Sequence, residues 1–517
     1  MPSRLLRIAL LLVLAGGVAT SATVRGSSAA RADEQPPPAE TSTEPTVTTP
    51  PPATAPTTTT TPATTTPAPA EKGVELVVTV LDGDRRLRVR GARVRLAGHS
   101  KRTNRDGVAT VVVPHRRHAF TVSIAAKGFQ TRTLLVHFEL KRKQTLRIYR
   151  PDLQWPMYGV DNSRTQAQPH IKLRPPFRTV WSLNMGGLIE FPAVVDDGVA
   201  YIGNAKGQVR AISMRFGKVI WRHDTPGHPR MASSPAVAGT EVVYHTMDGH
   251  VDVLRQANGH PLWSYDAGSP IESSPIVHDG VDYFGAWNGR VSALDLKTHK
   301  LRWTRTLGAK ITSSAAIVGG TLYIGDYSGR LWALSARTGA TRWVGQVNGR
   351  IYGTPAVANG RIFVPSSTGY SLTAFSTRGA RLWTVRAGGY VYSSPAVASG
   401  RVFFGSYDGS FYGVSAATGR LLWRVYAGGP ISGAAVVVDG IAYAGSFARR
   451  ILGVNAATGK TVLTYRHGDY VPVSGNGMRL LFHGYSRLYA VEPRTAGRKA
   501  VTRITASSSN SSRRPGK

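Results

Sequence analysis

An all-β fold made of repeated sheets is predicted by three observations on this sequence. Tryptophan recurs every forty residues from Trp263 to Trp423, and Trp181 and Trp221 extend the series backwards with steps of 40 and 42. Each interval contains several short runs of β-branched and aromatic residues that are separated by glycine-containing turns. No stretch between these tryptophans has sustained helical periodicity. A period near forty with several short strands per period is typical of repeat architectures, in which each unit buries its faces only against its neighbours.

One interval, from Trp383 to Trp423, shows what each repeat contains. Four strands are expected within it, at Val391–Val397, Arg401–Gly405, Ser410–Val414 and Leu421–Val425. Asp408-Gly409 separates the second strand from the third, and this dipeptide favours a tight hairpin turn because such turns need positive φ. Four short antiparallel strands in forty residues describe one blade of a β-propeller.

The number of blades follows from the phase of the repeat. Eight inner-strand runs can be counted, but the eighth copy ends after Arg487–Val491 without a fourth strand. Phe177–Leu183 has the pattern of a fourth strand and no blade of its own. Pairing the two would close the ring and remove exposed strand edges. The sequence therefore predicts an eight-bladed propeller over 151–493, in which residues 151–176 are either a connector or a docked segment.

A recurring motif carries a family resemblance. Ala-x-Asp or Ala-x-Ser followed by glycine and tryptophan occurs at Ala293–Trp303 (with His299 in place of the glycine) and Ala333–Trp343. It resembles the tryptophan-docking motif of pyrroloquinoline-quinone (PQQ)-type eight-bladed propellers, a family that includes quinoprotein alcohol dehydrogenases and the propeller lipoprotein of the outer-membrane assembly machine. The resemblance implies that the indoles pack between blades, at Trp221, Trp263, Trp303, Trp343, Trp383 and Trp423.

The sequence predicts three segments in the N-terminal part of the chain. Residues 1–32 form a signal peptide or an N-terminal membrane anchor, because Arg4 and Arg7 precede an apolar run that starts at Ile8. Residues 33–71 consist almost entirely of Pro, Thr, Ala and Glu and are expected to be a disordered linker. Residues 72–150 contain Gly-Ala-x-Val-x-Leu at Gly91–Leu96, Thr-Asn-x-Asp-Gly at Thr103–Gly107 and a Lys127-Gly128-Phe129 corner. This order resembles the carboxypeptidase-regulatory-like β-sandwich, a family of accessory modules. The predicted fold class is thus all-β, an eight-bladed β-propeller preceded by a small β-sandwich, with a disordered linker and tail.

Charge and composition narrow the classes of partner. The chain carries a formal net charge of +35 and has no cysteine, so it has no disulfide, lipid-attachment cysteine or c-type haem site. Residues 72–150 hold 19 Lys and Arg against five Asp and Glu, a net of +14, and the Ser-rich tail 494–517 holds seven basic residues and no acidic ones. For an exported protein, such a surface favours anionic wall or membrane polymers as partners, with nucleic acid the least favoured.

Catalytic chemistry finds little support in the residues. A quinone-dependent dehydrogenase needs PQQ with Ca²⁺ and grouped carboxylates, but Asp295, Asp326, Asp408 and Glu272 fall on different blades. The histidines near 223–250 lack the spacing of a metal site. No catalytic residue and no metal ligand is therefore assigned.

Rim positions of the propeller provide the candidate binding site. Residues just before each inner strand are expected to line one mouth of the central channel, namely Arg230, Glu272, Lys310, Arg350, Tyr352, Tyr390, Tyr392 and Tyr470. Basic and tyrosine side chains round a funnel suit an extended polypeptide or an anionic sugar; the alternative is that they are ordinary polar rim residues. The leading hypothesis is a non-enzymatic, secreted or cell-envelope scaffold that binds envelope proteins or anionic polymers. The competing hypothesis is a PQQ-dependent alcohol or sugar dehydrogenase outside the cytoplasm.

Overall fold

The computed structural model describes residues 73–113, 119–137, 142–469 and 473–494. Within these ranges the chain is all-β, and its only helical element is the 3₁₀ turn η1 (Pro151–Leu153). The predicted leader, the linker and the tail beyond residue 494 lie outside the described residues. Among the helices that the structure describes, none has the length and apolar character needed to cross a membrane.

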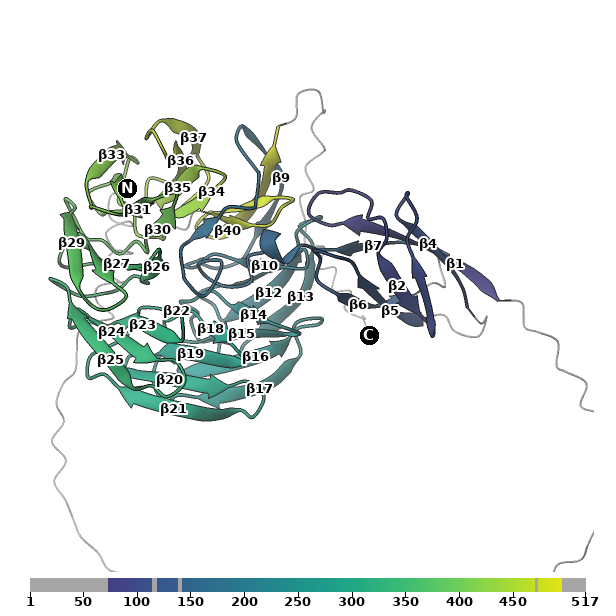
Figure 1. Cartoon of the computed structure of the whole chain (residues 1–517), viewed down its shortest axis with the longest axis horizontal. Helices are drawn as coiled ribbons and strands as arrows, with labels where there is room; N and C mark the ends of the chain where they lie inside the picture. Colours follow the sequence, from purple (N-terminus) through teal and green to yellow (C-terminus); the bar gives the residue numbers. More distant parts are fainter. Residues whose placement is uncertain (1–72, 114–118, 138–141, 470–472, 495–517) are drawn as a thin grey trace, which may run out of the picture. The chain divides into compact units, whose positions relative to one another are not determined.

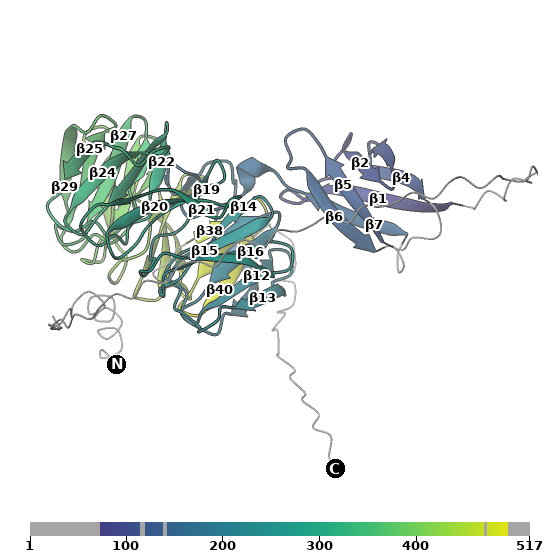
Figure 2. The same cartoon turned by 90° about the horizontal axis from the view of Figure 1, so that it is seen from below.

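The described residues between 74 and 148 form a β-sandwich of two sheets (Figure 2). Alternate residues of its strands are buried between the sheets, as in Val78, Val94 and Val122, so the period-2 pattern of the sequence becomes an apolar interior. One sheet has the order β4 (Val108–Val113), β1 (Val74–Asp82), β7 (Lys143–Ile148), and the other has the order β3 (His99–Arg102), β2 (Arg93–Leu96), β5 (Ala119–Ala125), β6 (Arg132–His137).

Eight sheets follow in the described part of the chain, seven of four strands and one of five, and they surround a common axis (Figure 1). We name them blades 1 to 8. In blades 1 to 4 the strands are β10 (Val194–Asp196), β11 (Val199–Gly203), β12 (Gln208–Ser213), β13 (Val219–Asp224); β14 (Ala236–Ala238), β15 (Glu241–His245), β16 (His250–Arg255), β17 (Pro261–Asp266); β18 (Ile276–His278), β19 (Val281–Gly285), β20 (Arg290–Asp295), β21 (Lys300–Thr306); and β22 (Ala316–Val318), β23 (Thr321–Gly325), β24 (Arg330–Ser335), β25 (Thr341–Gln346).

The remaining blades complete the propeller. In blades 5 to 7 the strands are β26 (Ala356–Ala358), β27 (Arg361–Ser366), β28 (Ser371–Ser376), β29 (Arg381–Arg386); β30 (Ala396–Ala398), β31 (Arg401–Gly405), β32 (Ser410–Ser415), β33 (Leu421–Tyr426); and β34 (Val436–Val438), β35 (Ile441–Ser446), β36 (Arg450–Asn455), β37 (Thr461–Tyr465). Blade 8 joins β38 (Val473–Gly475), β39 (Leu480–His483) and β40 (Arg487–Pro493) to β9 (Phe177–Asn184). The antiparallel register of β40 with β9 pairs Ala490 with Trp181, so an N-terminal strand supplies the fourth strand of the last blade.

The inner strands are shorter than the sequence indicates. In blade 6 we expected a strand over Val391–Val397, but the ladder begins only at Ala396. Pro395 has no N–H to donate, and Ser394 before it bonds to a neighbouring blade instead: its Oγ accepts the backbone N–H of Thr354 in blade 5 at 2.9 Å. Near the axis of the ring, hydrogen bonds of serine hydroxyls therefore connect neighbouring blades, in addition to the strand pairing within each blade.

Tryptophan side chains lie at the contacts between successive blades. Trp303 of blade 3 donates from Nε1 to the carbonyl of Ala336 in blade 4 at 2.9 Å, and a Cβ added to Gly339 would lie 2.6 Å from the indole Cε3. Corresponding bonds join Trp181 to Met214, Trp221 to Gln256, Trp343 to Thr377, Trp383 to Ala416 and Trp423 to Ala456. Trp263 differs, because His299 replaces the glycine: the two rings stack 4.4 Å apart, and Nε1 of Trp263 is buried without a partner.

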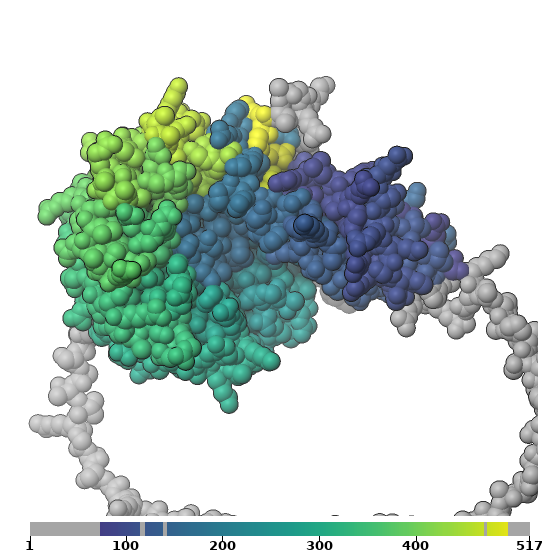
Figure 3. All heavy atoms as spheres, in the orientation of Figure 1, coloured from purple at the N-terminus to yellow at the C-terminus, as the bar shows by residue number. Residues whose placement is uncertain are grey.

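Residues 155–168 run through the centre of the ring, so this part of the segment before β9 is docked rather than a loose connector. Their carbonyls accept backbone N–H bonds from the inner strands of most blades: Trp155 accepts from Val195 in blade 1, and Gln166 accepts from Val437 in blade 7. In addition, β8 (Ala167–Gln168) pairs in parallel with β34. Blue atoms of this part of the chain fill the middle of the ring in Figure 3. Arg164, which is 1% exposed, donates to the carbonyls of Ala315 and Pro275. Residues 155–168 thus fill the space along the axis of the ring.

Candidate functional site

The predicted rim residues occupy one repeated position, just ahead of the inner strands. Arg230, Lys310, Arg350 and Tyr390 are spaced by multiples of forty residues, and Glu272, Tyr352 and Tyr392 lie two positions further along the repeat. Tyr470 lies outside the described residues. A backbone bond that recurs from blade to blade brings a second loop to the same end of the ring; in blade 4 it runs from the N–H of Tyr327 to the carbonyl of Lys310 at 2.9 Å. We call this end of the ring, lined by both loops, the mouth.

A buried carboxylate lies at the centre of the mouth. Glu272 is 7% exposed and accepts hydrogen bonds from the hydroxyl of Tyr352, two blades further on, and from Trp287 Nε1 at 3.1 Å. Burial raises the pKa of Glu272, while hydrogen bonds from Tyr352 and Trp287 and the charge of Lys310 work in the opposite direction. The bond between Glu272 and Tyr352 connects blades 3 and 5 past blade 4, so it fixes the two rim loops across the mouth.

Cations of the mouth lie on aromatic faces. Nζ of Lys310 is 3.2 Å from the centroid of the Trp287 ring and 5.2 Å from that of Tyr327, and the guanidinium of Arg350 is 5.5 Å from the same Tyr327 ring. Burial lowers the pKa of Lys310. Cation–π contacts of this kind hold positive charge in place while its polar hydrogens stay available to a ligand.

Tyrosines continue the aromatic surface on the far side of Tyr352. Tyr390 is 39% exposed, so this surface is open to solvent at its edge. The ring centroids are 5.1 Å apart for Tyr352 and Tyr392, 5.7 Å for Tyr390 and Tyr392, 5.0 Å for Tyr392 and Tyr407, and 4.9 Å for Tyr370 and Tyr390. Aromatic pairs at these separations pack favourably, and their hydroxyls provide hydrogen bonds at the edge of an apolar surface.

Arg230 belongs to the mouth through an ion pair rather than through the aromatic surface. Its Nε is 2.9 Å from Oε2 of Glu190, and its guanidinium also contacts the other carboxylate oxygen. This bidentate pair joins blades 1 and 2 and leaves Arg230 with less capacity to bind an external anion than Arg350, which is exposed. Six of the seven described rim residues therefore belong to one cluster of Glu272, two cations and three tyrosines, and Arg230 lies beside this cluster.

Several mouth residues were missed by sequence reasoning. Glu190 has the same repeat phase as Arg230, so the forty-residue spacing alone could have identified it. Trp287, Tyr327 and Tyr407 are also spaced by multiples of forty residues, at the end of the second strand of their blades. That second aromatic series was the available signal, because antiparallel neighbours bring the end of the second strand to the start of the first.

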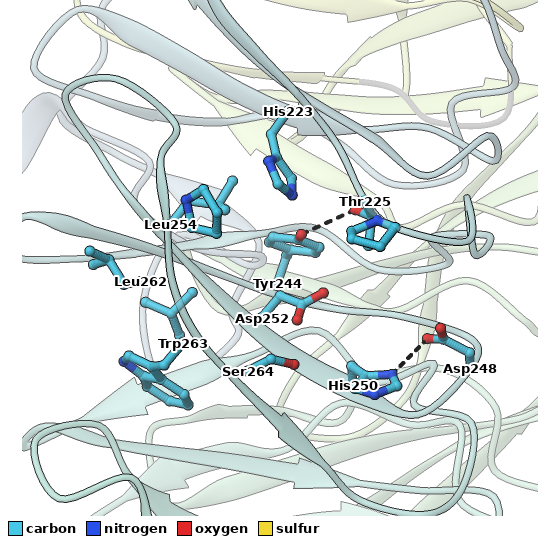
Figure 4. Close-up of a pocket in the computed structure, with 13 residues that line it drawn as sticks. His223, Thr225, Tyr244, Asp248, His250, Asp252, Leu254, Leu262, Trp263 and Ser264 are labelled. Atoms are coloured by element: carbon cyan, nitrogen blue, oxygen red, sulfur yellow. Dashed lines mark hydrogen bonds and ion pairs between the residues drawn. The ribbon is translucent and has the colours of Figure 1, made fainter.

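A separate pocket of about 360 Å³ lies between blades 1 and 2 (Figure 4). His223 of β13 faces Tyr244 and Asp252 of blade 2, and Leu254 and Leu262 contribute apolar surface. Neither lysine nor arginine lines it. The pocket therefore suits an apolar group that carries a hydrogen-bond donor, and no group on this chain fills it among the residues that the structure describes.

Histidines from the 223–250 region do not form a metal centre. His223 and His250 line the pocket, whereas His245 does not line it; His245 is buried and bonds to Asp282 at 2.8 Å. His250 contacts Asp248 at 3.2 Å, and burial lowers the pKa of His223. Across the described residues no group of three or more His, Asp or Glu side chains is arranged to hold a metal ion.

Fold and mouth together define a β-propeller of the PQQ-like class, with interlocking tryptophans and a polar, aromatic rim. A family model described as "Outer membrane protein assembly factor BamB" matches residues 177–317, 287–392 and 371–515. These segments cover more than half of the chain, and the chain belongs to this family.

Individual relatives come from two groups. BamB of Xanthomonas campestris is 28% identical over 136 residues, and the quinoprotein ethanol dehydrogenase of Pseudomonas putida is 36% identical over 81 residues. The matched segments amount to 33% and 13% of the lengths of those relatives, and to 23% and 15% of this chain.

Solved structures from the same two groups share the fold. BamB of Moraxella catarrhalis has a TM-score of 0.54 at 17% sequence identity, and the match covers 63% of this chain and 100% of that structure. The quinohemoprotein alcohol dehydrogenase of Comamonas testosteroni has a TM-score of 0.58 at 14% identity, and the match covers 66% of this chain and 81% of that structure.

The described residues of the mouth lack the features that a PQQ site requires. PQQ with Ca²⁺ needs a free flat face for the ring and a set of oxygen ligands for the cation. In the described mouth, Lys310 covers the face of Trp287, Glu272 is taken by two donors, and Glu190 is taken by Arg230. Asp326 and Asp408 are bonded within their own blades, to Trp332 and Tyr412. These residues do not fit the cofactor.

Proposed function

We propose that the protein is a non-enzymatic binding scaffold of the cell envelope, and that the mouth of its propeller holds an extended segment of a partner protein. The observation that carries this proposal is the cluster of Trp287, Tyr352, Tyr392, Lys310 and Arg350 around the buried Glu272. Tryptophan, tyrosine and arginine are the residue types that dominate binding energy at protein interfaces.

Rigidity of the rim supports a role in binding. Glu272 joins the loops of blades 3 and 5, and the segment 155–168 fills the ring behind them, so the aromatic surface is held in place before a ligand arrives. A pre-organised surface loses less side-chain entropy on association. Tyrosine hydroxyls and the exposed guanidinium of Arg350 would bond to the peptide backbone or to acidic side chains, while the rings contact apolar side chains.

Location outside the cytoplasm is part of the same proposal. The predicted leader over residues 1–32 and the Pro/Thr-rich linker over 33–71 would export the folded part and hold it away from the membrane or the wall. Removed or retained as an anchor, residues 1–32 would in either case direct the folded part out of the cytoplasm. The sandwich would act as an accessory module of the carboxypeptidase-regulatory-like type.

Site-specific crosslinking tests the mouth directly. A photo-reactive amino acid is placed at Tyr390, which is 39% exposed, and in a matched control at Tyr426 on the outer strand β33, which is 69% exposed. We expect the full-length protein to form a discrete adduct with an envelope protein from Tyr390 and not from Tyr426. Tyr392→Ala should abolish that adduct while the melting curve keeps its shape.

Two results would overturn the proposal. Equal adducts from both positions, or an adduct that survives Tyr392→Ala, would show that the mouth does not select the partner. Stoichiometric binding of PQQ in the presence of Ca²⁺, together with dye-linked oxidation of an alcohol or a sugar, would instead establish a quinoprotein dehydrogenase.

A further inference from the structure

A basic groove lies on the β-sandwich, apart from the propeller mouth. It has a volume of about 560 Å³ and is formed by β2, by the end of β5 and by the turn that follows β5. Its charged lining consists of cations only, namely Arg90, Arg93, Arg95, Arg102 and Lys127, with Phe129 as an aromatic wall. We call this surface the sandwich groove.

Cations of the sandwich groove lack the ion pairs that other arginines of the sandwich make. Arg86 pairs with Glu492, Arg132 with Asp197 and Arg150 with Asp82, at 2.8, 3.4 and 2.9 Å. Within the described part of the chain, none of the five groove cations has a carboxylate within 4.0 Å. The groove is therefore a place where positive charge is concentrated and left uncompensated.

Strand register places these charges close together. Arg93 on β2 lies directly opposite Arg102 on β3, and Arg95 is two residues further along the same strand and on the same face. Like charges directly opposite each other in a sheet are destabilising, and residues two apart on a strand are separated by roughly 7 Å. A row of exposed guanidinium groups at that spacing lowers the stability of the sandwich unless an anion lies across it.

The shape and the residue types of the groove identify the anion. Four of the five cations are arginines, whose planar fork bonds to two oxygens of one phosphate or carboxylate. A bilayer surface is flat and cannot enter a concave groove, whereas one extended chain can lie along β2 with successive charges over successive arginines. Phosphate oxygens carry charge within the backbone of such a chain, so that it needs no side group to reach the guanidinium groups.

We propose that the sandwich groove binds a single chain of a linear polyanion with phosphate groups in its backbone, such as a polyphosphodiester of the cell envelope. This inference extends the proposed scaffold function by naming a second partner. Because the groove and the mouth share no residue, the two proposals can fail separately.

The test compares two triple variants of the full-length protein. Arg93→Gln/Arg95→Gln/Arg102→Gln removes three groove cations, and Arg85→Gln/Arg142→Gln/Lys143→Gln removes three exposed cations outside the groove. Both lower the net charge by three, and melting curves confirm that each variant folds. Binding of fluorescently labelled linear polyphosphate is measured by anisotropy over a series of salt concentrations.

We expect the groove variant to bind polyphosphate at least about tenfold more weakly, with a salt slope reduced by about two to three, because each lost phosphate contact removes about one unit of slope. The control variant should lose less than about threefold in affinity, as expected for non-specific screening alone. Tyr392→Ala in the mouth should leave polyphosphate binding unchanged.

Three outcomes would overturn the inference. Equal losses in the two triple variants would mean that only overall charge matters. Tighter binding to polyglutamate of matched length would replace phosphate with carboxylate as the ligand. Binding to anionic phospholipid vesicles with the same dependence on Arg93, Arg95 and Arg102 would identify a membrane surface instead of a single chain.

Discussion

Docking of an indole against a glycine of the next blade can be tested in blade 4 by substituting two glycines of the same backbone conformation. Gly339 (φ +70°) contacts Trp303, whereas Gly320 (φ +67°) has no atom near the position of an added Cβ. Alanine at either site adopts the left-handed region, which costs about 1–2 kcal/mol. That cost is common to the two variants and cancels in their comparison.

Only Gly339→Ala also displaces the indole. The added Cβ would lie 2.6 Å from Cε3 and 2.8 Å from Cδ2 of Trp303, so the ring must move away from the carbonyl of Ala336. Because Trp303 is half-buried, loss of the acceptor for its Nε1 costs about 1 kcal/mol, the lower end of the range for buried donors, and the displaced ring also loses packing contacts. We therefore expect Gly339→Ala to lower the free energy of unfolding by about 2 kcal/mol more than Gly320→Ala.

Guanidinium unfolding followed by tryptophan fluorescence measures this difference. The same pair of substitutions in a Trp303→Phe background is the control, and there the gap between the two alanine variants should shrink because no indole N–H remains to be displaced. Equal destabilisation of the two single variants, within about 0.5 kcal/mol, would refute the idea that indole docking contributes to stability beyond packing.

Three further predictions concern other buried groups. His299→Gly should let Trp263 donate from Nε1 to the carbonyl of Leu296, as Trp303 does to Ala336. A change in the indole emission maximum without loss of stability would report the new bond, and an unchanged spectrum would contradict this expectation. Burial raises the pKa of Asp84 to about 7, so this carboxyl favours the folded state below its unfolded pKa near 4, and that contribution is lost as pH rises through 7. Asp84→Asn should therefore match the wild type at pH 4 and exceed its unfolding free energy by up to about 4 kcal/mol at pH 8, as measured by denaturant titration at both pH values. Arg164→Met should cost about 3 kcal/mol in thermal or chemical unfolding, because the carbonyls of Ala315 and Pro275 lose their donor, whereas exposed Arg337→Met should cost less than about 0.5 kcal/mol.

Repetition made most of the propeller predictable from the sequence. The spacing from Trp263 to Trp423 fixes the phase of every turn, so the all-β class, the four-stranded sheets and the pairing of β9 with β40 could be derived without coordinates. The position of the rim residues followed for the same reason, because residues with one repeat phase have one place in the blade. Their function in binding stays a prediction.

Features that occur only once in the chain could not be predicted from the repeat. Residues 155–168 have no counterpart in other repeats, and their role in the ring depends on backbone bonds to distant strands that leave no side-chain pattern. The contact between Glu272 and Tyr352 joins positions eighty residues apart, so it depends on the curvature of the ring rather than on local sequence. His299 was visible as a break in the glycine series, but its stacking on Trp263 required the geometry.

Closure of the ring by β9 and β40 has a consequence for biosynthesis. The ribosome produces β9 before the other seven sheets and β40 after them, so β9 stays without its partner during nearly the whole of translation. A nascent chain that stalls before residue 487 would leave the hydrogen-bonding groups of β9 and of β39 exposed to other chains. The open edge of β9 is therefore covered only once the last residues of the propeller have been made, and an uncovered edge can pair with other chains.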